Sequence, residues 1–429
     1  IAYSAFKSNF YKLDKINLEI KFDDIVTLEN ERELAIKNKS LGLKEKLNKV
    51  DVIVNYNDEK IKSKIRLKGN RQIHYAKKKN SSYNIYLADN KKIYGTNSFG
   101  IHKPGVRNYI HEWMFNEMMG DLGLIKQKYE FFELFINGTS NGLYVFEEKM
   151  GKEILLRNKK KIGPILGHTD NFDRDLNKKI YHTYDKKFWN MPENIDLGKL
   201  AIKKINEFYD GTRKVEDTFN LEKFAAFFAV IDATYTTHAL FYNSKLYYDP
   251  LTGLFEPVPR DGHRQLPNYY SLNRNYYDLI ILDSVHSIEK FKELGNNLQI
   301  DSNKQWWINK FFINNNGEIN HSFYKLYLKY LTKISSQKYL ENFFDERQDK
   351  IDKINAHIYS DYFFYSNSDG YTWGLYYFKK DDLFYRAKIL RQRLKTENKK
   401  IRAIINKDKN YLVKIDNLNL INNYRNLVN

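Results

Sequence analysis

Residues 129–148 read YEFFELFINGTSNGLYVFEE and predict two β-strands joined by a tight turn. The segments 129–136 and 142–148 are rich in aromatic and aliphatic residues, which favour strands. The five residues between them, 137–141, are all Asn, Gly, Ser or Thr, which are typical of turns. This stretch therefore predicts an antiparallel hairpin.

Further strands are predicted on the N-terminal side of this hairpin. Apolar and polar residues alternate in segments 16–22, 50–56, 61–68 and 83–87. In the third of these, Ile61, Ile65 and Leu67 share one face, whereas the opposite face carries Lys and Arg side chains. Residues 1–150 are therefore predicted to be rich in strands, with one helix at 106–120.

The predicted helix carries an acidic residue among apolar ones. At 100° per residue, Glu117 falls within the stripe of Ile110, Trp113 and Met118, and Glu112 falls on the opposite side. A carboxylate that faces a core needs a cationic partner. The candidate partners on or near the preceding strands are Arg66, Lys68, Lys78 and Lys79.

The rest of the chain is predicted to be mainly helical. Segment 151–200 has weak periodicity and is expected to be irregular, and 221–238 predicts a strongly apolar helix. A short hairpin is predicted from 241–248 and 254–258, around the turn residues of 249–253. Three more helices are expected at 320–331, 338–357 and 379–405. The class is therefore α+β, with a strand-rich segment 1–150 followed by a helix-rich segment 151–429.

Composition and missing motifs exclude several classes of function. The net charge of the 429 residues is +18, but 53 acidic residues are interspersed with 71 basic ones, so no specific nucleic acid partner is expected. The chain contains no cysteine, which excludes disulfides and a cysteine nucleophile. It also lacks the phosphate-binding loop of Walker ATPases and the glycine motif of dinucleotide-binding enzymes. The absence of cysteine in a chain of this length fits an oxidising envelope compartment as well as it fits compositional drift.

A second group of polar residues surrounds the predicted short hairpin. Asn243 follows His238 by five residues, and Asp261 lies just beyond the hairpin. Protein kinases place a magnesium-binding Asn five residues after a catalytic Asp, and a magnesium-binding Asp beyond a short hairpin. Amide and carboxylate oxygens are suitable ligands for Mg²⁺. Taken singly, Asn243 also fits the start of a strand, and Asp261 with Gly262 fits a turn.

Taken together, these ordered motifs resemble the CotH family of spore-coat and envelope proteins, which have an atypical protein-kinase fold. The hairpin of 135–138 and 142–148 is the most specific of them. The others are Ile65-Arg66-Leu67-Lys68-Gly69-Asn70, the lysine-led strand 79–87, the arginine-led helix 107–123, and the pair of segments 243–247 and 257–261.

The resemblance implies a two-lobed, kinase-like fold that binds ATP and Mg²⁺. One lobe would be an N-terminal antiparallel sheet with one helix, and the other would be mainly helical. Lys68 or Lys79 would bind the ATP phosphates, with Glu117 as the partner of that lysine, and Glu148 would lie near the hinge between lobes. Asn243 and Asp261 would coordinate Mg²⁺. His238 stands where the family usually carries the catalytic Asp.

Departures from the family pattern leave the activity open. Besides His238, Arg260 replaces a Trp, and His263 replaces a second acid. The resemblance implies a phosphotransferase of the cell envelope, periplasmic or extracellular, acting on protein hydroxyl groups. The alternatives are a pseudokinase scaffold and a polysaccharide-binding envelope protein. Asp232 would replace the missing Asp only if its helix ended early. The chain starts at Ile1 rather than Met, so an absent N-terminal segment could associate it with a membrane surface.

Overall fold

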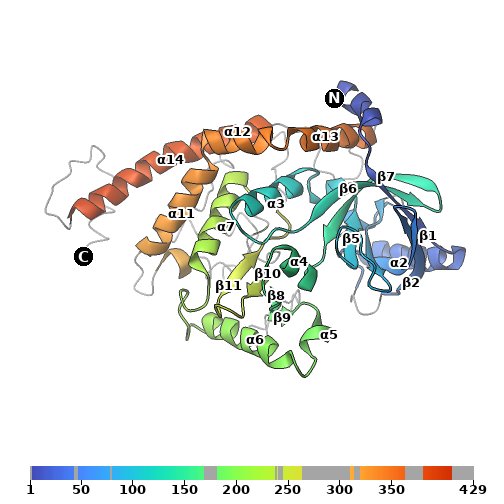
Figure 1. The fold of residues 1–429 in the computed structure, drawn as a ribbon, viewed down its shortest axis with the longest axis horizontal. Coiled ribbons are helices and arrows are strands. Elements are labelled where there is room, and N and C mark those ends of the chain that lie inside the picture. The colour runs from blue at the N-terminus through green and yellow to red at the C-terminus, as the bar shows by residue number, and fades with distance from the viewer. Residues whose placement is uncertain are drawn as a thin grey trace. The chain divides into compact units, whose positions relative to one another are not determined.

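The computed structural model describes residues 2–42, 47–77, 80–168, 181–236, 239, 245–262, 310–313, 319–362 and 380–407 (Figure 1). The strands are β1 Asp14–Glu19, β2 Val50–Tyr56, β3 Glu59–Leu67, β4 Tyr83–Leu87, β5 Ser98–His102, β6 Tyr129–Ile136, β7 Thr139–Glu148, β8 Ile165–His168, β9 Tyr181–Thr183, β10 Lys245–Tyr248 and β11 Phe255–Val258. The helices are α1 Ala2–Lys7, α2 Phe22–Asn38, α3 His111–Asp121, α4 Lys152–Arg157, α5 Lys186–Trp189, α6 Ile195–Tyr209, α7 Leu221–Thr234, α11 His321–Ile334, α12 Gln337–Asp345, α13 Gln348–Tyr362 and α14 Lys380–Lys407. No helix among the described residues is both long and apolar enough to cross a membrane.

The first seven strands form a closed barrel in the order β1-β2-β3-β4-β5-β7-β6 (Figure 1). The predicted hairpin forms from β6 and β7, which are antiparallel, but β7 begins at Thr139 rather than at 142, so the turn is shorter than the predicted 137–141. The barrel closes because β1 pairs with β2 on one side and lies parallel to β6 on the other, with Ile16 opposite Leu134. The protein is α+β, but the expected kinase-like lobe with an antiparallel sheet is wrong. Alternation along a strand shows which residues face the core, and it is the same in an open sheet and in a closed barrel. The alternation therefore could not distinguish the two architectures.

Apolar side chains from alternate strand positions fill the barrel. Ile16, Ile65, Ile85, Phe99 and Phe146 are all fully buried in this core. Residues between these positions point to the outside of the barrel, because successive side chains of a strand face opposite sides. The outer face of β3, β5 and β7 thus carries polar residues of the candidate site described in the next subsection.

The N-terminal part of the chain contains more helix than predicted. Helix α2 contributes Leu28 and Ala35 to the barrel core, although the sequence analysis expected one helix, which corresponds to α3. The structure has α1, α2 and α3 in this region. The predicted irregular segment 151–200 contains α4, β8, β9 and α5 within its described residues. Strands β8 and β9 join the predicted β10–β11 hairpin in a second sheet of order β11-β10-β8-β9.

The described residues fall into two compact units. One lies within Ile1–Asn220, Thr236–Asn273 and Phe344–Phe378, and the other within Leu221–Tyr235, Arg274–Phe343 and Lys379–Asn429. These units are defined by spatial contacts, whereas the predicted segments 1–150 and 151–429 are defined along the chain by their strand and helix content. The division at residue 150 stays a prediction.

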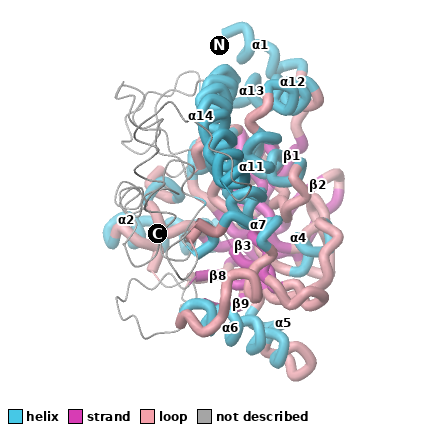
Figure 2. The backbone as a smooth tube through the Cα atoms, turned by 90° about the vertical axis from the view of Figure 1, so that its left-hand side faces the viewer, coloured by secondary structure: helices cyan, strands magenta, loops and turns pink. Residues whose placement is uncertain are grey.

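The second unit is built on three packed helices, α7, α11 and α14 (Figure 2). Phe224 of α7 is fully buried and stacks on Phe311, with their ring centroids 4.9 Å apart. Asp232 lies inside α7, so the helix does not end early. Its carboxylate accepts a hydrogen bond from Tyr327, and Arg386 Nε donates to its backbone carbonyl at 2.9 Å. These contacts give Asp232 a structural role within this unit.

Candidate active site: a buried ionic cluster on the barrel

Lys68 and Glu147 form a buried ion pair on the outer face of the barrel. Lys68 directly follows β3, and Glu147 lies in β7 between two buried strand residues. The Lys68 side chain crosses β5 at Gly100, whose backbone is paired with Glu147. A Cβ atom at position 100 would lie 2.7 Å from Lys68 Nζ. Any larger residue at this position would push the end of the lysine side chain from its present path to the carboxylate.

Replacing Gly100 with alanine is expected to lower the free energy of unfolding by about 1.5–3 kcal/mol, the value of a hydrogen bond to a charged group. The added methyl group would displace Lys68 from Glu147. Denaturant unfolding measures the change. Gly105→Ala is the matched control, because a Cβ there meets Tyr109 at an ordinary 3.6 Å. Equal stability of the two variants would show that Lys68 reaches Glu147 by another path.

Glu147 is held by several cationic or polar groups at once. Arg260 Nη2 lies 2.8 Å from its Oε1, and His102 Nε2 lies 3.3 Å from its Oε2. Burial alone would raise the pKa of Glu147, but Lys68, Arg260, His102 and Arg107 together hold it well below its usual range. Burial lowers the pKa of Lys68 to about 8, and Glu147 offsets only part of that effect. Both groups are therefore mainly charged at pH 7.

A second ion pair brings Asp261 into the same cluster. Arg107, at the end of the short 3₁₀ helix Pro104–Arg107, places its Nη2 2.7 Å from Asp261 Oδ1. Arg260 Nε lies 3.8 Å from the same oxygen. Because Arg260 also contacts Glu147, the segment that follows β11 is joined to the Lys68 pair on the barrel.

Helix α3 adds Glu112 to this cluster. Glu112 is 2% exposed, and its carboxylate accepts a hydrogen bond from the backbone of Gly262. A Cβ atom at Gly262 would lie only 1.8 Å from Phe115 Cδ1, so the helix packs directly on this glycine. Burial, followed by the charge of Asp261, raises the pKa of Glu112 to about 8.

The predicted orientation of α3 is wrong for its two acidic residues. Glu112 was expected on the exposed side, but it is the buried one. Glu117 has a side chain that is 19% exposed and forms ion pairs with Lys126 at 2.7 Å and with Arg347 at 3.5 Å. The helix begins at His111 rather than at 106, and the residues before it form a separate short helix. Trp113, Phe115, Met118 and Met119 are buried together with Glu112, so α3 is buried on most of its sides and an apolar stripe does not show which carboxylate is buried.

Glu148 lies beside the cluster but has its own partners. It is 3% exposed, Arg157 Nε donates to its Oε1 at 3.2 Å, and the backbone N–H of Lys128 donates to its Oε2 at 2.8 Å. These contacts tie the end of β7 to α4 and to the start of β6. The place near a hinge that the family resemblance implies for Glu148 stays a prediction.

Three of the predicted site residues lie outside the described residues. They are Lys79, His238 and Asn243. Of the other four, Lys68 and Asp261 lie in the ionic cluster, and Glu117 and Glu148 pair with other residues as described above. The roles of all seven residues stay predictions.

Sequence reasoning missed several members of the cluster. Glu147, Arg107 and Glu112 were not predicted as site residues, and Arg260 was noted only as a departure from a family motif. Strand alternation carries a usable signal for Glu147, because Phe146 faces the barrel core and its neighbour must face outward. Arg107 lies in a separate short helix before α3, and Glu112 lies on the side of α3 opposite its apolar stripe, so helical periodicity indicated neither residue.

Asp261 and Glu112 are the cluster carboxylates that suit a divalent cation. Burial and, after it, the charge of Asp261 raise the pKa of Glu112, and a bound cation would offset both effects. Carboxylate oxygens are also the donors that Mg²⁺ prefers. In the described part of the chain, however, no group of three or more His, Asp or Glu side chains is placed to hold a metal. Mg²⁺ would therefore need further donors, and Asn243 is the predicted one.

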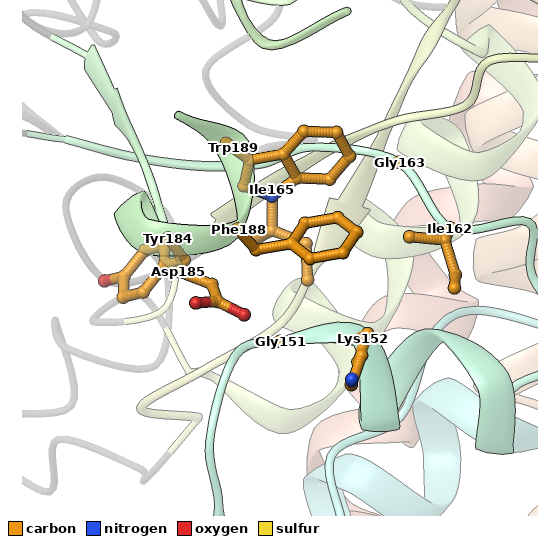
Figure 3. Close-up of a pocket in the computed structure, with 9 residues that line it drawn as sticks. All are labelled: Gly151, Lys152, Ile162, Gly163, Ile165, Tyr184, Asp185, Phe188 and Trp189. Atoms are coloured by element: carbon orange, nitrogen blue, oxygen red, sulfur yellow. The ribbon is translucent and has the colours of Figure 1, made fainter. Parts of the chain in front are cut away.

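A small hollow elsewhere in the first unit is lined by aromatic residues (Figure 3). Tyr184, Phe188 and Trp189 line it together with Asp185 and Lys152. None of the predicted site residues belongs to its lining, but Tyr184 is close enough to Arg260 of the ionic cluster to act on its charge.

Protein kinases hold the ATP phosphates with a lysine that pairs with a glutamate and with an aspartate that binds Mg²⁺. The cluster contains these residue types in Lys68, Glu147 and Asp261. The family model for CotH kinase protein matches residues 65–373. The chain therefore belongs to the CotH kinase family. No curated protein matches it.

Proposed function

We propose that this protein is a phosphotransferase of the CotH kinase family that uses ATP and Mg²⁺ to phosphorylate hydroxyl groups of proteins. The observation that carries the proposal is the contact between Arg260 and Glu147. Through it, the phosphate-binding lysine and the metal-binding aspartate of the proposed mechanism belong to one buried cluster. Membership of the family supports the same function.

The residues of the cluster have distinct proposed roles. Lys68 would neutralise charge on the phosphates, and Glu147 would hold the lysine in place across Gly100. Asp261, with Glu112 and Asn243, would hold Mg²⁺, which when bound neutralises the charge that develops on the transferred phosphate. His238 would accept the proton of the substrate hydroxyl, because a neutral imidazole is a suitable base near pH 7. Catalysis would then consist of positioning and charge stabilisation.

The cell envelope is the proposed location. The support for it is the absence of cysteine from all 429 residues, since an unpaired thiol is a liability in an oxidising compartment. An acceptor protein in the same compartment follows from this proposal.

A nucleotide-binding pseudokinase is the second candidate. It is favoured by the arginines around Asp261, because Arg107 Nη2 occupies a position 2.7 Å from the carboxylate oxygen that Mg²⁺ would need. The substitution of His238 for the usual Asp supports the same function. Such a protein would bind ATP without transferring its phosphate.

Replacing Lys68 with methionine is expected to weaken ATP binding at least ~tenfold, because a charge-assisted hydrogen bond to phosphate is lost. Calorimetric titration of ATP with Mg²⁺ measures this change. Lys79→Met is the matched control, since Lys79 is the competing lysine in the sequence, and it should bind ATP as the wild type does. The opposite ranking would assign the phosphates to Lys79.

Incubation with radiolabelled ATP and candidate acceptor proteins separates the two functions. Transfer of label to serine, threonine or tyrosine supports the phosphotransferase. ATP binding without transfer supports the pseudokinase. Absence of ATP binding at millimolar concentration contradicts both.

A further inference from the structure

Asp261 is already matched by a cation of its own chain. Arg107 Nη2 lies 2.7 Å from Asp261 Oδ1, and each of the two side chains is 12% exposed. Arg260 lies farther away, because its Nε is 3.8 Å from the same oxygen and its Nη2 donates a hydrogen bond to Glu147. Arg107 therefore supplies the charge that balances Asp261 most directly.

The backbone on both sides of this ion pair is strained. Asp261 has a φ of 57°, and Asn108 and Tyr109, which directly follow Arg107, have φ values of 52° and 61°. Residues other than glycine rarely adopt such values, and a bulky aromatic residue does so least readily. Strained residues persist only where surrounding contacts hold them, and they cluster at active sites and switch segments. The ion pair thus joins two strained segments, which is typical of a contact with a functional role.

Arg107 depends on its carboxylate partners because it is buried. Burial would lower its pKa, but the charges of Asp261, Glu147 and Glu112 raise it. Mg²⁺ held by Asp261 and Glu112 would leave Arg107 beside Glu147, which already pairs with Lys68. A buried charge without a full partner is costly. Phosphate oxygens would supply the missing partner, because they match the donors of a planar guanidinium.

We propose that Arg107 keeps the metal site closed until a nucleotide binds. In the free protein it pairs with Asp261, and it pairs with the nucleotide phosphates when Mg²⁺ takes its place. This inference rests on the proposed function, in which Asp261 is a ligand of Mg²⁺. It goes further because it makes the binding of the metal depend on the nucleotide, so that the free protein discriminates against divalent cations.

Titration of the nucleotide-free protein with Mn²⁺ tests the inference. Mn²⁺ prefers the same oxygen ligands as Mg²⁺, and the EPR signal of the free ion reports how much is unbound. Arg107→Gln should bind Mn²⁺ at least ~tenfold more tightly than the wild type, since tenfold is less than the usual effect of removing one partner of a buried ion pair. Arg347→Gln is the matched control, because Arg347 pairs with Asp121 at 2.6 Å and its side chain is 15% exposed. Its affinity should equal that of the wild type.

A double variant identifies the carboxylate that gains the metal. Arg107→Gln combined with Asp261→Asn should lose the added affinity, because the carboxylate that Arg107→Gln sets free is no longer present. Equal affinity for Mn²⁺ in the wild type and Arg107→Gln would overturn the inference. A gain that persists in the double variant would overturn it as well, since the cation would then bind elsewhere.

The wild type provides a measurement that does not depend on the folding of a variant. At constant ionic strength, Mg²⁺ alone should leave its melting temperature unchanged, whereas Mg²⁺ with a non-hydrolysable ATP analogue should raise it, because a ligand that binds only the folded state stabilises that state. A rise with Mg²⁺ alone, or no rise with both, would contradict the inference. Failure of the proposed function has a different signature, because phosphate transfer would be absent while Arg107→Gln still gained affinity for Mn²⁺.

Discussion

Replacing Asp261 with asparagine is expected to reduce phosphate transfer from ATP at least ~100-fold, the usual effect of removing one group that stabilises transition-state charge. In the proposed mechanism, this carboxylate is a ligand of Mg²⁺, and an amide is a weaker one. ATP binding should be largely retained, because the cations Lys68 and Arg260 remain paired with Glu147. The expected result is therefore a loss of transfer without a comparable loss of affinity, measured with radiolabelled ATP and by calorimetry.

The substitution also removes the charge partner of Arg107, so a control for the loss of an ion pair is needed. Asp121→Asn provides it, because Asp121 Oδ1 lies 2.6 Å from Arg347 Nη2 at a surface position of the same unit. Transfer by Asp121→Asn should equal that of the wild type. Undiminished transfer by Asp261→Asn would refute the assignment of the metal site.

Replacing Glu147 with glutamine is expected to destabilise the protein by about 3–5 kcal/mol, the usual effect of removing one partner of a buried ion pair. Lys68 and Arg260 would both lose the charge that compensates them. Denaturant unfolding at pH 7 measures the change. Glu256→Gln is the matched control, since Glu256 has the same 4% side-chain exposure as Glu147, but its partner Lys160 is 21% exposed and can turn to solvent. A smaller effect is therefore expected for Glu256→Gln, and equal effects would contradict the special role of Glu147.

The same variant should change the response to acid. The pKa of Glu147 in the folded protein lies well below its ordinary value of 4.5. A carboxyl whose pKa is lowered by folding stabilises the folded state above its unfolded pKa, and this contribution is lost as pH falls towards the folded pKa. The wild type should thus lose stability as pH is lowered from 4.5, and Glu147→Gln should lack this part of the decline. Parallel pH profiles for the two proteins would contradict the lowered pKa.

The local structure of the barrel was largely predictable, but its closure was not. The bounds of β2 and β4 match the predicted segments because alternation is strong in each, and those of β6 match because that segment is rich in aromatic and aliphatic residues. Strand β5 was missed, because its residues Ser98, Gly100 and His102 leave only a short apolar pattern. The pairing of β1 with β6 joins residues more than one hundred positions apart, and no local pattern encodes that contact.

Sequence motifs identified part of the candidate site, but not the partners of the residues they identified. Lys68 and Asp261 were identified from ordered motifs, and both lie in the ionic cluster. The partners of Lys68 and Asp261 depend on backbone details that the motifs do not contain. Helix α3 is buried on most sides, so its apolar stripe does not separate Glu112 from Glu117, and Gly100 leaves room for the Lys68 side chain on its way to Glu147.

Closure of the barrel has a consequence for the choice of expression boundaries. The segment matched by the family model begins at residue 65, inside β3, and therefore excludes β1 and β2. A fragment cut at that residue would shorten β3 and leave both it and β6 with open edges, which are templates for intermolecular pairing. Fragments for crystallisation or assay should consequently start before Asp14, or they are expected to aggregate.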